Sequence, residues 1–210
     1  MKETELAEKF ITFFGDPYKI YKEVPAGGGI IDFVAKDKVI TIAVEVKTNL
    51  NFRVIEQANM NKYYCTYSYI ATPITKGHHF GHQICRDYGI GVLSYTGSDK
   101  YMEGIHEEVR PKMNRHKIRL KLEEYMKQSV AGSQNDRVTP FKNTINNMVD
   151  YIRQHPECTL KNCLESINFH WSNMSSAKGS VYQWIQRGVI TEFRLDKGKL
   201  YLNEQPSAAP

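Results

Sequence analysis

Three charged side chains stand in or directly after two short apolar runs. Asp32 lies inside the run Ile30–Ala35, and Glu45 and Lys47 lie at the end of the run Val39–Val46. Apolar runs of this length are bound for a core, where a charge is strongly unfavourable unless it is paired or holds a metal. The three side chains therefore raise the question of whether they form a functional site.

Carboxylates, a lysine and a backbone carbonyl in this arrangement suit phosphodiester hydrolysis. Asp32 and Glu45 would repel each other, and a divalent cation would relieve that repulsion. Mg²⁺ prefers hard oxygen ligands and keeps several waters, one of which can become the attacking hydroxide. The carbonyl of Val46 is a further candidate ligand, and Lys47 would orient or deprotonate the water or stabilise the transition state. We expect Mg²⁺ as the cofactor, with Mn²⁺ as an alternative.

The two runs must form neighbouring strands for this site to exist. Alternate residues of a strand share a face, so Glu45 and Lys47 project together, and a tight turn at 36–38 makes the two strands antiparallel neighbours. The sequence does not fix their register, and we expect a stagger, or a bulge near the glycines, to let Asp32 and Glu45 converge. The alternative is an ordinary salt bridge between Asp32 and Lys47.

The first hundred residues predict the order α-β-β-β-α-β-α-β, from hydrophobic periodicity and turn residues. The expected helices cover 4–14, 53–64 and 78–88, and the expected strands cover 18–24, 30–35, 39–46, 67–71 and 90–95. A three-strand meander followed by crossover helices gives an α/β class, a mixed sheet flanked by helices. We assign this domain to residues 1–100.

The stretch YKEVPAGGGIIDFVAKDKVITIAVEVKTNLNFRVIEQA resembles the PD-(D/E)XK nuclease superfamily. Asp32 matches the aspartate of that family, Glu45–Lys47 its ExK motif, and Gln57 the glutamine that many members carry on the next helix. The resemblance covers roughly residues 4–95. It implies a restriction-endonuclease-like core and Mg²⁺-dependent cleavage of DNA, in which Gln57 orients the lysine or a phosphate.

The sequence departs from the family pattern at two places. Ile31 replaces the proline of the motif, and Asn61 stands where some members carry a tyrosine. Many members also use a glutamate of the first helix, for which we take Glu8, while Glu5 and Glu23 stay open. Inactivated members only bind DNA, so a non-catalytic DNA-binding or regulatory protein is the alternative function.

Composition agrees with an ordinary globular chain. Of 210 residues, 41% are apolar and 24% charged, which excludes a disordered polymer. No apolar run approaches the roughly 20 residues that span a bilayer, and no signal peptide is evident. We expect no membrane partner and a cytoplasmic location.

A basic stretch, RPKMNRHKIRLK at 110–121, holds six cations and no acid. It suits a phosphate backbone, and the alternative is a solvated helix face. We expect residues 101–138 to form a basic helical linker with a helix over 115–127. Its expected DNA contacts are Arg115, Lys117 and Arg119.

Residues 139–204 predict three helices and a hairpin, the pattern of a winged helix-turn-helix. Thr139 caps a helix with Pro140 at its first position, which ends near His155. Further helices are expected over 159–167 and 172–187, and strands over 189–195 and 199–202. The expected DNA contacts of the last helix and the wing are Asn173, Ser176, Lys178, Arg194, Lys197 and Lys199. The alternative for the winged helix is a protein partner. Whether the protein acts as a homodimer stays open.

Two other clusters are weaker candidates for a metal. One is the histidine group His78, His79 and His82. The other is the set His155, Cys158, Cys163 and His170, whose spacing fits no familiar zinc pattern. Surface or packing roles are the simpler interpretation of both.

Overall fold

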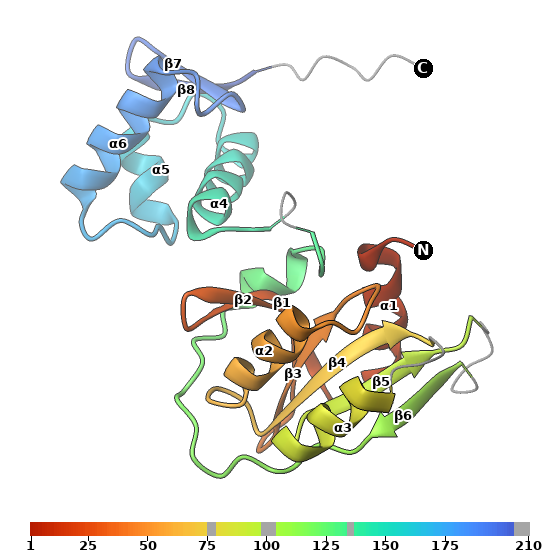
Figure 1. The fold of residues 1–210 in the computed structure, drawn as a ribbon. Coiled ribbons are helices and arrows are strands. Elements are labelled where there is room, and N and C mark those ends of the chain that lie inside the picture. Colours follow the sequence, from red (N-terminus) through yellow and green to blue (C-terminus); the bar gives the residue numbers. More distant parts are fainter. Residues whose placement is uncertain (75–78, 98–103, 134–136, 204–210) are drawn as a thin grey trace. The chain divides into compact units, whose positions relative to one another are not determined.

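The computed structural model describes residues 1–74, 79–97, 104–133 and 137–203. The chain divides into two compact units, Met1–Arg137 and Val138–Pro210 (Figure 1).

Six strands of the first unit form one mixed sheet, in which the spatial order follows the chain. The strands are β1 (Lys19–Ala26), β2 (Gly29–Lys36), β3 (Thr41–Val46), β4 (Tyr67–Pro73), β5 (Gly91–Tyr95) and β6 (Ile105–Val109). β1, β2 and β3 are antiparallel neighbours, β3, β4 and β5 are parallel, and β6 is antiparallel to β5. The expected α/β class is therefore confirmed.

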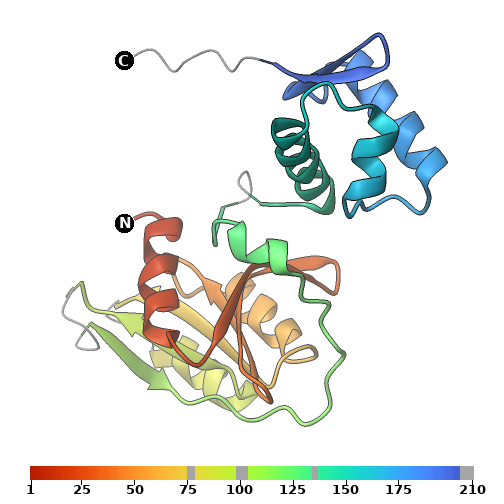
Figure 2. The ribbon, with the colours of Figure 1, turned by 180° about the vertical axis from the view of Figure 1, so that it is seen from behind.

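Helices cover both faces of this sheet. α2 (Phe52–Asn61) and α3 (His79–Tyr88) lie over one face in Figure 1, and α1 (Glu3–Phe14) lies over the other in Figure 2. α2 and α3 connect the parallel strands, which require a crossover. No helix in the described ranges is long and apolar enough to cross a membrane.

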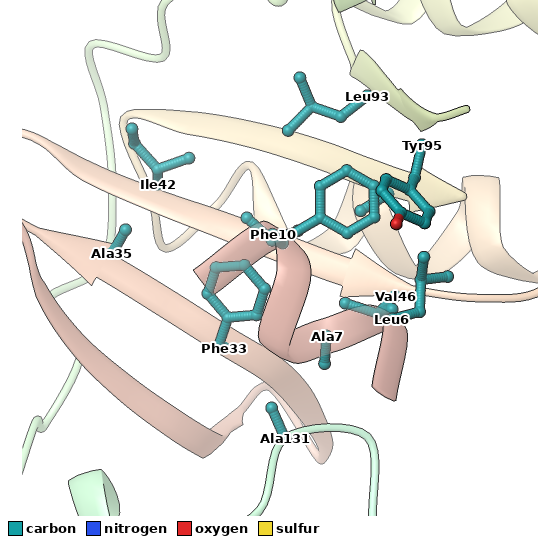
Figure 3. Close-up of a cluster of buried hydrophobic side chains, with 12 residues drawn as sticks. Leu6, Ala7, Phe10, Phe33, Ala35, Ile42, Val46, Leu93, Tyr95 and Ala131 are labelled. Atoms are coloured by element: carbon teal, nitrogen blue, oxygen red, sulfur yellow. The ribbon is translucent and has the colours of Figure 1, made fainter. Parts of the chain in front are cut away.

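The core under α1 fixes the helix that approaches the site. Leu6 and Phe10 are fully buried and stand four residues apart, on one side of the helix. They pack with Phe33 of β2 and Val46 of β3 (Figure 3). Because alternate strand residues face opposite sides, the neighbours of Phe33 and Val46 are directed to the other face of the sheet.

The register of β2 and β3 decides whether the two carboxylates meet. The paired residues are Phe33 with Val44, Val34 with Ala43, Ala35 with Ile42 and Lys36 with Thr41. The paired stretch ends at Phe33 and Val44, and continuing its register by one step would place Asp32 opposite Glu45. The connection sets this register: Asp37 accepts the backbone N–H groups of Val39 and Ile40, at 2.7 and 2.6 Å, which closes a loop longer than the expected turn.

The structure of residues 104–133 differs from the helical linker that the sequence predicted. β6 adds a sixth strand beyond residue 100, and no helix forms over 115–123. Only a 3₁₀ helix, η1 (Glu124–Gln128), follows. The preceding segment is extended because its backbone N–H groups bond to the stretch between α2 and β4 and not to a helix of its own. The Ile118 N–H, for example, donates to the carbonyl of Tyr63 at 2.7 Å.

The second unit contains three helices and a hairpin, as expected. The elements are α4 (Pro140–Gln154), α5 (Leu160–Ser166), α6 (Met174–Gln186), β7 (Phe193–Asp196) and β8 (Lys199–Leu202). The predicted N-cap is confirmed, since the Thr139 side chain accepts the Lys142 N–H at 3.1 Å. The first strand begins at Phe193 rather than at residue 189. Buried side chains of all three helices, with Phe193 and Leu200, form a separate core.

We predict that Phe10→Ala lowers the unfolding free energy of the first unit by about 3–5 kcal/mol, because it removes a fully buried ring beneath α1. The measurement is chemical denaturation of the full chain followed by circular dichroism. Tryptophan fluorescence assigns the transitions, since both tryptophans, Trp171 and Trp184, lie in the second unit. The exposed Thr12→Ala is the matched control, and a Phe10→Ala loss below about 1 kcal/mol would contradict the packing role.

Candidate active site

Asp32 and Glu45 form a buried carboxyl pair on adjacent strands. They are 8% and 1% exposed. The backbone N–H of Val46 donates to Asp32 Oδ2 at 2.7 Å, and Asn61 Nδ2 of α2 donates to Glu45 Oε1 at 2.7 Å. The two carboxyl groups are themselves hydrogen-bonding neighbours. The pair is therefore held in place from the strand and from the helix above it.

Burial and mutual repulsion disturb the protonation of this pair. Burial, and then the charge of Asp32, raise the pKa of Glu45. Burial also raises the pKa of Asp32, although the neighbouring Lys47 ammonium opposes the shift. Two carboxylates this close cannot both ionise freely, so the pair retains a proton to higher pH than an exposed acid does. A divalent cation would replace that proton.

Lys47 reaches the pair from the end of β3. Its Nζ lies 3.1 Å from Asp32 Oδ2, 2.9 Å from the Val46 carbonyl oxygen and 3.4 Å from Glu3 Oε2. Burial by itself would lower the pKa of Lys47, but the carboxylates of Asp32, Glu3 and Glu45 outweigh it and raise the pKa. The side chain is thus an ammonium donor. The sequence left three roles open for Lys47. A protonated lysine favours orienting a water or stabilising the transition state over deprotonating the water.

The acid that α1 brings to Lys47 is Glu3. Glu8 instead forms an ion pair with Lys22 at 3.1 Å near the surface, and Glu5 accepts the backbone N–H of Lys2 at 3.1 Å at the start of the helix. Glu3 precedes the buried residues Leu6 and Ala7 by three and four positions, which places it on the sheet-facing side. That spacing was the sequence signal for Glu3.

Glu23 is a third buried carboxyl group beside the site. The β1–β2 register places it opposite Asp32, with Lys22 and Val24 paired on either side. Burial, and then the charge of Asp32, raise the pKa of Glu23 to about 7. Its Oε1 accepts the Gly132 N–H at 2.8 Å, and its φ of 54° is a left-handed conformation rare for a side-chain-bearing residue. Such strain persists where surrounding contacts hold it.

Gln57 and Asn61 occupy successive turns of α2. Asn61 makes the contact with Glu45, and it stands at the position where some members of the family that the sequence resembles carry a tyrosine. Among the described residues, Gln57 makes no hydrogen bond to Asp32, Glu45 or Lys47. The structure therefore brings the side-chain amide of Asn61, and not that of Gln57, to the carboxyl pair.

The oxygen donors of this site fit a hard divalent cation. Asp32, Glu45 and the carbonyl of Val46 are oxygen ligands of the kind that Mg²⁺ and Mn²⁺ take. Burial is the main cause of the raised pKa values of both carboxyl groups, and a bound cation would stabilise their ionised forms. No group of three or more histidine, cysteine, aspartate or glutamate side chains in a metal-binding arrangement occurs in the described part of the chain. Waters would complete the coordination, as is usual for Mg²⁺.

The expected DNA contacts lie in both units. Arg115, Lys117 and Arg119 are exposed on the extended segment of the first unit. In the second unit, Asn173 uses its side chain to cap α6 by accepting the Ser176 N–H at 2.9 Å. The remaining expected contacts belong to α6 or to the hairpin. Lys178 is half-buried, Lys197 is exposed in the turn, Lys199 pairs with Glu157 at 2.7 Å, and Arg194 lies 5.5 Å from the Tyr201 ring centre.

The weaker metal candidates do not gather in the described residues. His78 lies outside the described ranges, while His79 and His82 belong to α3. Cys163 is buried in the core of the second unit, and the His170 ring bonds the hydroxyl of Thr144 at 2.9 Å. Packing and hydrogen bonding account for both residues of the second unit.

Comparison of the chain with family models, with curated proteins and with solved structures finds no match in any of the three. The resemblance to the PD-(D/E)XK superfamily therefore rests on the motif and on the arrangement of Asp32, Glu45 and Lys47.

We predict that the metal-free first unit loses stability as pH rises from about 5 to about 8. The pKa of Glu23 rises from 4.5 to about 7 on folding, and that of Glu45 rises as well, so the folded chain binds more protons than the unfolded chain in this window. The unfolding free energy should fall by roughly 2 kcal/mol, as measured by denaturation at each pH in EDTA.

Saturating Mg²⁺ should reverse this slope, because a metal binds the ionised carboxylates. Glu45→Gln should flatten the metal-free slope, while Glu8→Gln, at an exposed ion pair, should leave it unchanged. A metal-free unfolding free energy that rises between pH 5 and 8 would be inconsistent with buried acids of raised pKa.

Proposed function

We propose that this protein is a metal-dependent DNA endonuclease built on a PD-(D/E)XK core. The observation that carries the proposal is the pair Asp32 and Glu45, buried on adjacent strands, with the Val46 N–H 2.7 Å and the Lys47 ammonium 3.1 Å from Asp32. Buried carboxyl groups with raised pKa values and a charge partner are typical of functional sites. The order of strands and helices supports the same family.

Asp32, Glu45 and the Val46 carbonyl would hold Mg²⁺, with Mn²⁺ as a substitute. When bound, the ion lowers the pKa of a coordinated water and stabilises charge on the phosphate. The chain's own residues orient the groups around it. The Asn61 amide holds Glu45, and the Val46 N–H holds Asp32. Both carboxylates are therefore already in position before a metal binds.

Lys47 would act as a hydrogen-bond donor and positive charge beside the scissile phosphate. Its raised pKa keeps it protonated at neutral pH, and a preorganised cation stabilises the charge that develops in phosphoryl transfer. Glu3, at 3.4 Å, positions the ammonium from α1. In its ionised form, the buried Glu23 would add negative charge that favours cation binding.

For the second unit we propose a winged helix-turn-helix that binds duplex DNA. Three helices followed by the β7–β8 hairpin have the order of that motif. α6 is the candidate recognition helix, since Ser175 and Ser176 near its start are exposed, and the exposed Lys197 lies in the hairpin turn. A winged helix that binds a protein instead is the competing interpretation.

A non-catalytic DNA-binding protein is the second candidate function. The specific observation in its favour is the ion pair of Lys47 and Asp32, with Nζ also bonded to the Val46 carbonyl. In the metal-free chain these contacts partly satisfy the buried charge. Metal binding and cleavage separate the two candidates.

We predict Mg²⁺- or Mn²⁺-dependent cleavage of plasmid and oligonucleotide DNA by the wild-type protein. Asp32→Asn and Lys47→Met should each lower the cleavage rate by about 10²–10⁴-fold, because they remove a metal ligand and a cationic donor. Isothermal titration calorimetry should show that Asp32→Asn loses Mn²⁺ binding.

Glu3→Gln should lower the rate by about tenfold, since it acts through Lys47. Glu8→Gln removes a charge from the same helix away from Lys47 and should cleave like wild type. Metal-independent cleavage, or full activity of Asp32→Asn, would rule out this site.

We also predict that Lys178→Gln with Lys197→Gln weakens binding of duplex DNA in EDTA. If each cation neutralises one phosphate, the slope of log affinity against log salt should become shallower by about 1.8. Fluorescence anisotropy at several salt concentrations measures it. Lys161→Gln, which removes an exposed cation of α5 paired with Glu165 at 3.7 Å, should leave the slope unchanged. An unaltered slope in the double variant would favour a protein partner for the second unit.

A further inference from the structure

A basic cleft of about 510 Å³ opens beside the first unit's β2–β3 connection. It is lined by Lys36, Thr41, Tyr64 and the residues 117–122 of the extended segment. This is the stretch that replaces the expected linker helix. The cleft exists because that segment runs alongside the sheet without folding into a helix.

The wall formed by the extended segment is anchored to the sheet. The Asn114 N–H donates to the carbonyl of Thr66 at 2.9 Å, and the Ile118 N–H donates to that of Tyr63 at 2.7 Å. Lys117 Nζ also bonds the hydroxyl of Thr66. Backbone contacts at two points hold the segment that carries the cations in place, so this wall of the cleft is preformed.

The charge of the lining is one-sided. Lys36, Lys117, Arg119 and Lys121 all line the cleft, and no acid does. Among the described residues, only Lys121 of these four forms an ion pair, with Glu123 at 3.1 Å, and its own side chain is 89% exposed. Like charges gathered in a concave site raise the local concentration of anions. The complementary ligand therefore carries several negative charges.

An aromatic ring stands among these cations. The hydroxyl of Tyr64 lies against Gly27, where an added Cβ would come within 2.5 Å of its oxygen, so the β1–β2 turn holds the ring in place. Cations that follow a backbone and a ring on which a base stacks are the combination used by binders of single strands. The size of the cleft is that of a pocket for one small ligand, which admits a nucleotide but not a duplex.

The cleft and the carboxyl pair share one face of the β2–β3 hairpin. Asp32 and Lys36 are both even-numbered in β2 and therefore project to the same side, and their paired positions in β3 are Glu45 and Thr41. Four residues of strand separate the two sites by about 13 Å. Val34 and Ala43 lie between the two sites on this face and are fully buried, so a nucleic acid at the carboxyl pair is near the cleft without an open strand surface joining the two.

We propose that this cleft binds a single-stranded segment of nucleic acid, so that the protein acts on DNA with an unpaired strand next to the cleaved bond. The choice of nucleic acid rests on the proposed nuclease function, whereas the preference for a single strand comes from the cleft. Lys36 and Arg119 contact phosphates, and Tyr64 stacks on a base.

The test is binding of a labelled oligonucleotide of about 12 thymidines, and of a hairpin duplex of equal length, by fluorescence anisotropy in EDTA. Lys36→Gln with Arg119→Gln should weaken single-strand binding by about tenfold and make its salt slope shallower by about 1.4. Duplex affinity should change less than twofold. Tyr64→Leu should weaken single-strand binding by about tenfold, and Tyr64→Phe should retain it.

Arg86→Gln with Arg153→Gln is the matched control, because it removes the same charge from α3 and α4 and should leave both affinities unchanged. Melting curves establish that every variant is folded. Equal losses for single strand and duplex, or none for either, would overturn the proposal. The binding assay contains no metal, so its result does not depend on whether the protein cleaves DNA. A loss of single-strand binding without a loss of duplex binding would support the proposed role of the cleft even if the protein does not cut.

Discussion

The repulsion between two buried carboxyl groups, Asp32 and Glu45, is the constraint on which the site depends. Side chains 8% and 1% exposed cannot both carry a charge unless positive groups or donors surround them. The Val46 N–H, Asn61 and Lys47 supply that surrounding from the strand, from α2 and from the strand end. Each contact stabilises the charged form of one member of the pair.

The hydrophobic core explains why this pair is positioned so firmly. Phe33 and Val46, next to Asp32 and Glu45 in sequence, are fully buried beneath α1. Strand alternation then directs the two acids to the opposite face. A slip of the register by one residue would bury charges under α1 and expose the apolar side chains, so packing enforces the register that brings the acids together.

The basic segment illustrates where local reasoning fails. Its cations and helix-compatible residues over 115–127 predict a helix. In the structure, however, backbone N–H groups of the segment donate to the carbonyls of Tyr63 and Thr66 and not to carbonyls within a helix. Helix propensity is a weak preference that tertiary contacts override. The same limit applies to α1, where the candidates Glu5 and Glu8 fit the helix but only Glu3 reaches Lys47, because reach depends on how the helix lies on the sheet.

The sequence by itself determined the elements of the sheet and the identity of the charged triplet Asp32, Glu45 and Lys47, because alternation, turn residues and caps act over a few positions. Tertiary structure alone decided three things: that Asp32 and Glu45 meet on adjacent strands, that Asn61 and the buried Glu23 join them, and that residues 117–122 wall a basic cleft. All three depend on contacts between segments that are far apart in the chain. Strand pairing and core packing set the geometry of these contacts, and local sequence patterns do not determine strand pairing or core packing.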